Sequence, residues 1–135
     1  MPGIQVGLAS EATAVVDERV LARSLGSGDV AVYGTPAMIA LIEAAAVAAL
    51  TPVLAEGQSS VGIAVEVKHL AATPPGQRVR ARAEVIEVLG RKVTFAVQAW
   101  DEVDLIGEGT HTRYVIDVAR FMQRVQDKRP RAQTQ

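Results

Sequence analysis

A long apolar stretch that begins just after a threonine–proline pair constrains the fold of this chain more than any other feature. From Ala37 to Leu50 every residue is apolar except Glu43. Thr35 can cap the first turn of a helix with its hydroxyl, and Pro36 fits the first helical position without the loss of an amide hydrogen bond. About 14 residues rise roughly 21 Å as a helix, which suits a domain core and is shorter than a bilayer. We therefore predict a buried central helix.

Runs with the alternation and β-branched content of strands lie on both sides of the predicted helix. One run precedes the helix, and four follow it, joined by short turns. Asp17–Ser24 predicts a short helical or irregular segment, and Ala119–Arg129 predicts a polar C-terminal helix before a frayed tail, Pro130–Gln135. The predicted strands are Glu11–Val16, Ser60–Leu70, Arg78–Leu89, Lys92–Asp101 and Leu105–Asp117.

The order of these elements predicts the fold class. One strand, a long apolar helix and four consecutive strands describe an antiparallel sheet wrapped around a single helix, which is an α+β arrangement. A length of 135 residues accommodates one ordinary domain, so we assign residues 1–135 to a single domain. A sheet with a long free edge strand gains stability by pairing with a copy of itself. We therefore expect a homodimer.

Composition and charge exclude several classes of function. A formal net charge of −1 provides no basic field to attract nucleic acid. The absence of cysteine excludes disulfides, thiolate metal sites and cysteine nucleophiles. Neither Met1–Ser10 nor any later stretch has the pattern of a signal peptide or the length of a membrane span, so we expect a cytoplasmic protein with no membrane partner. No zinc-binding histidine pair is present, and no metal is predicted.

Glu43 is the one charged residue within the apolar stretch, which extends to Leu54. An unpaired carboxylate in a buried helix is costly, and a carboxylate in a low-dielectric site is a natural general base. The alternative is a solvent-facing stripe on the helix. Its neighbours one turn away are all apolar, however, and we therefore favour a functional role. These neighbours are Ile39, Ala40, Ala46 and Val47.

The two histidines and Thr35 each allow a structural and a functional interpretation. In its predicted strand His69 shares a face with Ile63, opposite the face of Gly62. A structural histidine at a sheet rim and a catalytic histidine both suit that position. For His111 we favour a role at the sheet surface or an interface. The hydroxyl of Thr35 suits a helix cap, and beside the free amides of the first turn it also suits oxyanion stabilisation.

These residues and their spacing resemble a known family. Thr35, Glu43 and His69 lie eight and 26 residues apart, and two further segments carry the likeness: HLAATPPG, from His69 to Gly76, and DEVDLIGEGTHTR, which ends at Arg113. Over nearly its whole length the chain resembles the hotdog-fold thioesterases of the fluoroacetyl-CoA thioesterase type. The resemblance implies a hotdog fold, in which a sheet of about five strands wraps around one long helix.

The resemblance also implies an activity. The chain is expected to hydrolyse an acyl-CoA thioester at a site on the interface of a homodimer. Glu43 acts as general base or as nucleophile, His69 assists proton transfer, and Thr35 positions the thioester. Coenzyme A enters as part of the substrate, and no cofactor is expected. Two alternatives stay open: a non-catalytic acyl-CoA-binding hotdog module, and a hotdog enoyl-CoA hydratase, which the lack of a histidine on the helix disfavours.

A substrate pocket is implied as well. By the same positional match Gly62 lies beside the acyl group, where a missing side chain lets the substrate carbonyl approach the strand. We assign Tyr33 and Arg113 to substrate binding too. The family's aromatic gating segment corresponds to residues 26–33, which contain no phenylalanine and one aromatic residue, Tyr33. We therefore expect a general small or medium acyl group rather than a fluorinated one.

Overall fold

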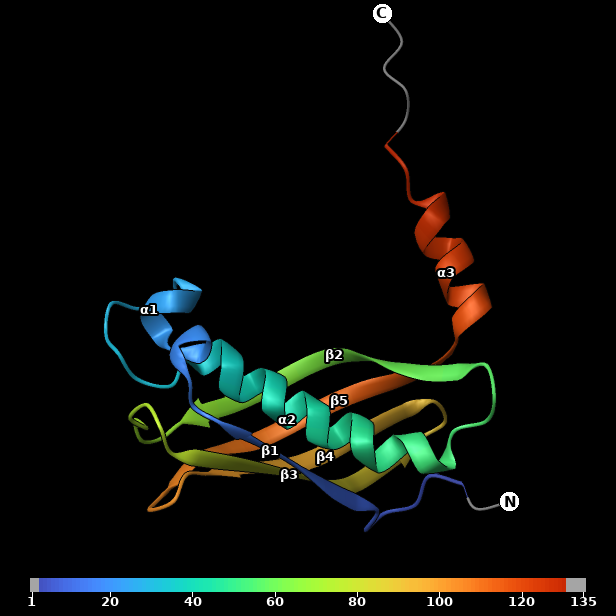
Figure 1. Ribbon diagram of the computed structural model, residues 1–135. Coiled ribbons are helices and arrows are strands. Elements are labelled where there is room, and N and C mark those ends of the chain that lie inside the picture. The colour runs from blue at the N-terminus through green and yellow to red at the C-terminus, as the bar shows by residue number, and fades with distance from the viewer. Residues whose placement is uncertain (1–2, 131–135) are drawn as a thin grey trace, which may run out of the picture.

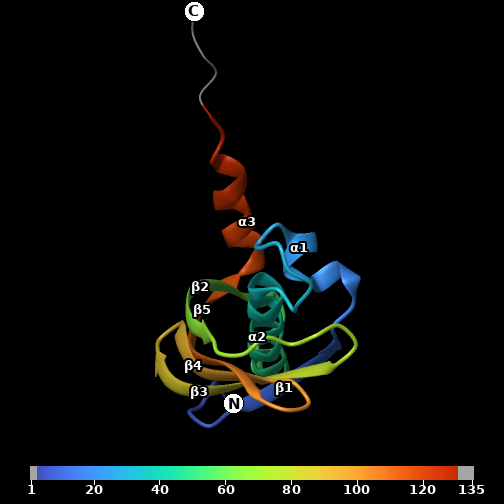
Figure 2. The same ribbon diagram turned by 90° about the vertical axis from the view of Figure 1, so that its left-hand side faces the viewer.

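A curved antiparallel sheet wraps around one helix in the computed structural model, which describes residues 3–130 (Figures 1 and 2). The five strands lie in the order β1-β3-β4-β5-β2, and every neighbouring pair is antiparallel. The predicted α+β architecture is therefore confirmed. Residues 131–135 of the predicted tail lie outside the described residues, as do Met1 and Pro2. The strands are β1 (Ala9–Val15), β2 (Gln58–His69), β3 (Arg78–Leu89), β4 (Lys92–Trp100) and β5 (Leu105–Asp117), and the helical elements are η1 (Glu18–Val20), α1 (Ala22–Leu25), α2 (Thr35–Leu50), η2 (Thr51–Val53) and α3 (Val118–Asp127).

The core lies between α2 and the concave face of the sheet. Alternate residues of β3 and β4 point toward α2 and are fully buried, as the period of a strand requires. Many of these residues are alanine or valine, which lets the helix approach the sheet closely. The inward residues of these strands are Val79, Ala81, Ala83, Val85, Val93, Phe95, Val97 and Ala99.

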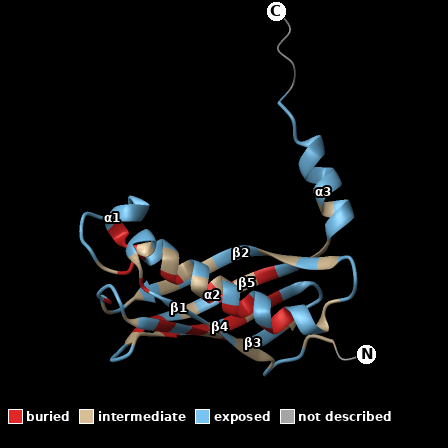
Figure 3. Ribbon diagram, viewed as in Figure 1, coloured by how far each residue is buried: buried red, intermediate tan, exposed pale blue. Residues whose placement is uncertain are grey.

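Only one face of α2 is buried in the single chain (Figure 3). Met38, Ile42 and Ala46 are buried against the sheet, whereas Val47 on the other face is 41% exposed. The prediction of a buried helix is therefore correct for one face and wrong for the other. A sequence that is apolar all around a helix does not indicate which face the sheet covers.

The helix is also longer than the sequence pattern predicted. Together with η2 it forms a 19-residue helical segment, Thr35–Val53, that is long and apolar enough to match a membrane span by length and composition. This corrects the expectation that no stretch reaches that length. The core helix of a sheet-covered protein meets the same criterion, and α2 packs against β1 and β3.

An irregularity in β2 changes which side chains face α2. The strand pairs Gly62 with Arg113 and Val65 with His111, so three steps along β2 match two along β5. A bulge of this kind inserts one residue and reverses the alternation beyond it. Ile63 is accordingly 53% exposed, contrary to the predicted alternation. As a consequence Gly62 and His69 lie on the same side of the sheet, where uninterrupted alternation would separate them.

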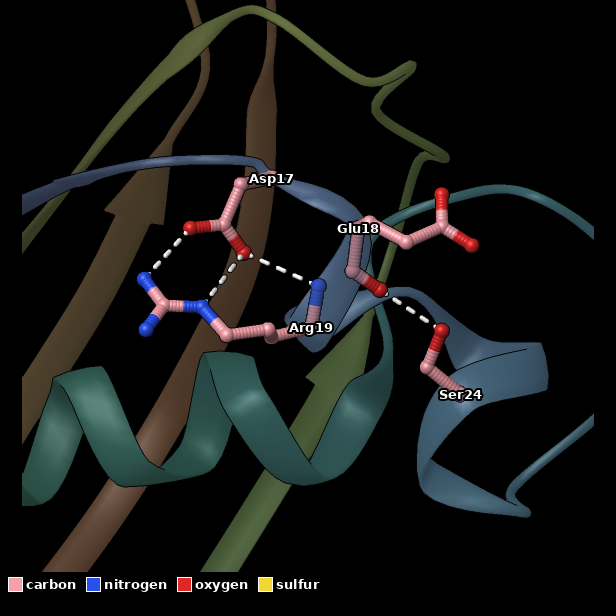
Figure 4. Close-up of polar contacts among 4 residues, drawn as sticks. All are labelled: Asp17, Glu18, Arg19 and Ser24. Carbon is pink, nitrogen blue, oxygen red and sulfur yellow. Dashed lines mark hydrogen bonds and ion pairs between the residues drawn. The ribbon is translucent and has the colours of Figure 1, made fainter.

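The segment between β1 and α2 is fixed by local hydrogen bonds (Figure 4). The side chain of Asp17 accepts from the backbone amide of Arg19 at 3.0 Å and from its guanidinium at 2.7 Å. Ser24 Oγ donates to the carbonyl of Glu18 at 2.6 Å. The chain then returns so that the Tyr33 amide donates to the carbonyl of Thr73 at 2.9 Å. The short helical segment predicted here is thus present as η1 and α1, and it places Tyr33 just before α2.

The C-terminal helix α3 projects away from the rest of the molecule (Figures 1 and 2). It begins one residue before the predicted start and ends at Asp127, and none of its residues is buried. The amide of Val118 donates to the carbonyl of Gly57 at 2.9 Å, which ties the base of α3 to the start of β2. The predicted polar helix is therefore present and contributes little to the core.

Candidate active site

Thr35 and His69 meet where β2 ends beside the start of α2. The hydroxyl Oγ1 of Thr35 lies 2.7 Å from Nδ1 of His69, which is hydrogen-bond distance. The cap position of α2 is occupied by Gly34, whose backbone is extended, and Thr35 makes no capping hydrogen bond. The predicted helix-cap role of Thr35 is therefore wrong. Thr35 is already inside the helix, and its hydroxyl turns to the imidazole.

The second nitrogen of His69 has no hydrogen-bond partner among residues 3–130. Nε2 is the one buried side-chain nitrogen or oxygen found without a hydrogen bond in the part of the chain that the structure describes. His69 also lines a cavity of about 330 Å³ together with Thr35 and Tyr33. Burial lowers the pKa of His69, so the neutral ring is favoured at neutral pH. A neutral imidazole with one free nitrogen can accept a proton or bind a polar ligand group.

Glu43 lies about two turns beyond Thr35 on α2. Its side chain is 39% exposed in the single chain, and its Oε2 lies 3.6 Å from Nη1 of Arg113, so the two form an ion pair. The expectation of a lone, buried carboxylate is therefore wrong on both counts. Glu43 sits at the border between the buried and exposed faces of α2, and a cation from β5 reaches it.

Arg113 is held by several contacts inside the sheet–helix layer. Its side chain is 8% exposed. Nε donates to Ser60 Oγ at 2.8 Å, Nη2 donates to the Ser60 carbonyl at 2.9 Å, and Nη1 donates to His111 Nε2 at 3.1 Å. Burial lowers the pKa of Arg113, and the charge of Glu43 acts in the opposite direction. The guanidinium is thus fixed in one plane beside the Glu43 carboxylate.

His111 is fully buried, at 0% exposed, and this corrects its predicted position at a sheet surface or interface. Its Nδ1 lies 2.8 Å from the carbonyl of Ala64, and its ring stacks on Phe95 with centroids 6.3 Å apart. Arg113 can only donate, so Nε2 of His111 accepts, and the proton of the neutral ring lies on Nδ1. Burial is the main cause that lowers the pKa of His111.

Gly62 leaves space for these polar groups. A Cβ atom at this position would lie 2.8 Å from Glu43 Oε2, 3.1 Å from His111 Cε1 and 3.4 Å from Arg113 Nη1. Real Cβ atoms do not approach an oxygen that closely, so any larger residue would displace the carboxylate. Because glycine has no side chain, a space remains at this position, and the Glu43 carboxylate borders it.

The structure brings the predicted residues together in two groups. Thr35, His69 and Tyr33 line one cavity near the start of α2. Glu43, Gly62 and Arg113 meet farther along the helix. The eight residues between Thr35 and Glu43 correspond to roughly 12 Å along the axis. Among residues 3–130, no hydrogen bond or ion pair joins the two groups.

Sequence reasoning did not assign a site role to Ser60 or His111. One signal was available, because residues two apart in a strand share a face. His111 therefore had to lie on the same side as Arg113, which was already a candidate. Ser60 carried no comparable signal.

The arrangement has the groups that proton-transfer chemistry requires. A carboxylate, a neutral imidazole and a hydroxyl all lie on the α2 side of the sheet, which is the set expected for acyl transfer to water. Within residues 3–130 no cluster of three or more histidine or carboxylate side chains is arranged to hold a metal ion.

Comparisons with known proteins agree with this chemistry. The chain matches the family model of the fluoroacetyl-CoA-specific thioesterase over residues 15–119. It is 46% identical over 99 residues to the fluoroacetyl-CoA thioesterase of Streptantibioticus cattleyicolor, a match that covers 73% of this chain and 71% of the relative. The predicted family is therefore confirmed at the level of sequence.

Solved structures give the same result. A structure of a fluoroacetyl-CoA thioesterase superposes with a TM-score of 0.88 at 40% identity, covering 96% of this chain and 100% of the other. A Thermus thermophilus protein described as a thioesterase superfamily member superposes with a TM-score of 0.85 at 32% identity, covering 95% and 97%. The chain therefore belongs to the fluoroacetyl-CoA-specific thioesterase family and is a hotdog-fold enzyme that hydrolyses acyl-CoA thioesters.

Proposed function

We propose that this thioesterase uses Glu43 as general base or nucleophile, His69 for proton transfer and Thr35 to position the thioester. The observation that carries the proposal is the 2.7 Å contact between Thr35 Oγ1 and His69 Nδ1, with the other nitrogen of His69 buried and without a partner in the described part of the chain. A buried polar atom without a partner is costly unless a ligand or a second chain supplies one. The Thr35–His69 pair can therefore bind a polar group of a ligand or of a second chain, which the single chain does not supply.

The substrate of the proposed reaction is a small or medium acyl-CoA without a required fluorine. Residues 26–33, just before α2, contain Tyr33 as their one aromatic residue. Burial raises the pKa of Tyr33 to about 12, so its hydroxyl stays protonated and can donate a hydrogen bond. Gly62 and Arg113 complete the proposed substrate-binding set. Coenzyme A is part of the substrate, and no separate cofactor takes part.

The enzyme acts as a homodimer in this proposal, with each site shared between two protomers. In a single chain Thr35–His69 and Glu43 lie roughly 12 Å apart along α2, which is too far for one water molecule to contact both. β2 is an edge strand of the sheet, and one face of α2 is exposed beside it. Pairing of two β2 edges would cover that face and bring the partner's Glu43 toward Thr35 and His69.

We also propose that the whole chain forms a single hotdog domain and that the enzyme is located in the cytoplasm. The apolar residues on one face of α2 cover the enzyme's own sheet, which supports a core helix rather than a membrane span.

A thiol-release assay tests the chemistry. Parent enzyme, Glu43→Gln and His69→Ala are compared on acyl-CoAs of graded chain length, with and without α-fluorine. We expect each substitution to lower kcat by about 10²–10⁴-fold, because that is the usual contribution of a general acid or base. Thermal unfolding serves as the control for folding. Parent-like turnover by either folded variant would show that the assignment is wrong.

A complementation experiment tests the shared site. Glu43→Gln and His69→Ala chains carrying different affinity tags are co-expressed, and the heterodimer is isolated. If each site combines Glu43 of one protomer with His69 of the other, one of the two sites is intact, and about half of the parent activity returns. If each site lies within one chain, both sites carry a substitution, and the heterodimer is as inactive as the two single-variant homodimers.

A further inference from the structure

A buried chain of polar contacts connects the backbone of β2 to the Glu43 carboxylate. It runs from the Ala64 carbonyl to His111 at 2.8 Å, from His111 to Arg113 at 3.1 Å, and from Arg113 to Glu43 at 3.6 Å. The chain begins at the residue that directly follows the bulge in β2. Its middle members are among the few buried polar residues of the described chain.

The contacts determine where the guanidinium of Arg113 can lie. Ser60 accepts from Nε and Nη2, which fixes one edge of the guanidinium plane. His111 accepts from Nη1, the same nitrogen that approaches Glu43. Without His111 this nitrogen would keep only the longer contact with a partly exposed carboxylate. The position of Nη1 therefore depends on His111.

We propose that His111, in its neutral form with the proton on Nδ1, is a positioning residue for thioester hydrolysis. It accepts from Arg113 and holds the guanidinium against Glu43, which keeps the carboxylate oxygen beside the space that Gly62 leaves open. His111 itself does not touch the substrate in this scheme. The inference rests on the proposed role of Glu43 as base or nucleophile.

The groups packed around His111 require it to be neutral. Arg113 on β5 carries a positive charge toward Nε2, the Ala64 carbonyl on β2 accepts from Nδ1, and Phe95 on β4 stacks on the ring. Two groups favour protonation of His111: the Ala64 carbonyl and the charge of Glu43 on α2. A second proton would place two donors and two positive charges face to face. The Nη1 contact would then break.

Two substitutions of His111 separate positioning from simple packing. Glutamine can accept from Arg113 through Oε1 but does not titrate, whereas leucine cannot accept at all. We expect His111→Leu to lower kcat roughly 10- to 100-fold, because a small displacement of a catalytic group has effects of that size. We expect His111→Gln to retain most of the parent kcat. Thr112→Val, on the outward face of the same strand, is the matched control.

The pH dependence of kcat provides a readout that does not require the leucine variant to fold. In the parent, protonation of His69 and of His111 both lower kcat on the acid side. In His111→Gln the contribution of His111 is lost while that of His69 is kept, so the acid limb becomes shallower. An acid limb identical to that of the parent would overturn the proposal, as would equal kcat values for folded His111→Leu and His111→Gln.

A double substitution distinguishes failure of this inference from failure of the proposed function. In the Glu43→Gln background, His111→Leu should have no further effect on the residual rate, because the group that it positions is absent. If Glu43→Gln alone keeps the parent kcat, the proposed function is wrong, and the inference goes with it. If Glu43→Gln is impaired but His111→Leu keeps the parent kcat, only the inference is wrong.

Discussion

The two polar groups on α2 differ in how completely the single chain satisfies them. Near the start of the helix, Thr35 and His69 share one hydrogen bond beside an open cavity, and none of the described residues pairs with His69 Nε2. Farther along, Arg113 donates to Ser60 and His111 and also pairs with Glu43. The first group is incomplete, and the second is nearly saturated.

This difference indicates that the two groups have different roles in the site. Catalytic groups must be held in place by neighbours that are themselves fixed, and hydrogen bonds to backbone carbonyls provide that support. Arg113, His111, Ser60 and Glu43 form what we call the central network, which is anchored at the carbonyls of Ser60 and Ala64. The Thr35–His69 pair keeps a free nitrogen, which suits contact with the substrate. The following substitutions test this contrast, from the largest expected change in the free energy of unfolding to the smallest.

Arg113→Met should have the largest effect. The substitution removes a buried cation together with its three hydrogen bonds, and it leaves His111 Nε2 without a donor. We expect the free energy of unfolding to fall by about 3 kcal/mol, measured by urea denaturation. Arg91→Met is the control, because Arg91 pairs with Asp117 at 3.3 Å on the exposed surface, where such a pair contributes at most about 1 kcal/mol. Equal losses in the two variants would contradict the contrast.

Gly62→Ala should separate stability from activity. Its Cβ would approach Glu43 Oε2 to 2.8 Å, and this oxygen is the end of a flexible, partly exposed side chain that can swing away. We therefore expect a loss of only about 1 kcal/mol in stability but roughly a 10- to 100-fold loss in kcat, because the carboxylate is displaced. Ser59→Ala, at an exposed position of the same strand, should change neither. A folded Gly62→Ala enzyme with parent kcat would show that the space beside Glu43 is not needed.

Much of the fold could be predicted from the sequence, because it follows from local pattern. Alternation predicts the buried face of β3 from Val79 to Val85, and a glycine–arginine turn predicts the hairpin that follows. Beyond Val85 a register shift ends the alternation, and Leu89 is 59% exposed, contrary to the pattern. The covered face of α2 could not be predicted. A helix that is apolar on all sides contains no information about which side meets the sheet, and the buried residues are decided by tertiary packing.

The site was predictable only where spacing or resemblance pointed to it. Thr35 and His69, which the resemblance placed in one site, lie in hydrogen-bond contact. The partner of Glu43 was missed, because an ion pair between residues so distant in the sequence leaves no local pattern. The burial of His111 was missed because Arg113, two residues away, suggested a solvent-exposed face of the strand. Arg113 is itself buried and hydrogen-bonded.

The bulge in β2 also escaped prediction, although Gly62 was a signal for it. A glycine inside a strand often marks a bulge or a close approach of backbone. Alternation alone placed Ile63 on the face of His69, and the inserted residue overturned that assignment. The roles of the catalytic and substrate-binding residues remain predictions that the proposed experiments test.

Thr35→Val should change stability less than the substitutions in the central network. It removes one hydrogen bond at an exposed position of α2, which contributes about 0.5 kcal/mol at such a site. We expect a clear loss of kcat nevertheless, because His69 loses the hydroxyl that orients its ring. Thr35→Ser keeps the hydroxyl and should keep most of the activity. A loss of stability as large as that of Arg113→Met would show that the pair is a structural contact.

The smallest expected effect is the pH dependence of stability. Burial lowers the pKa of both His69 and His111 in the folded enzyme, whereas an unfolded histidine has a pKa of about 6.5. Below about pH 6.5 the unfolded chain therefore binds protons that the folded chain does not, and the free energy of unfolding falls as the pH decreases. Above that pH both states are neutral at these rings, and this contribution to the pH dependence disappears.

The two histidines should differ in how much of this acid sensitivity they cause. A protonated His111 would face Arg113 in a fully buried site, whereas a protonated His69 lines a cavity that water can enter. Urea denaturation between pH 5 and pH 7.5 should therefore show a larger reduction of the pH slope in His111→Gln than in His69→Gln. A larger reduction in His69→Gln would mean that protonation destabilises the Thr35–His69 pair more than it destabilises the central network.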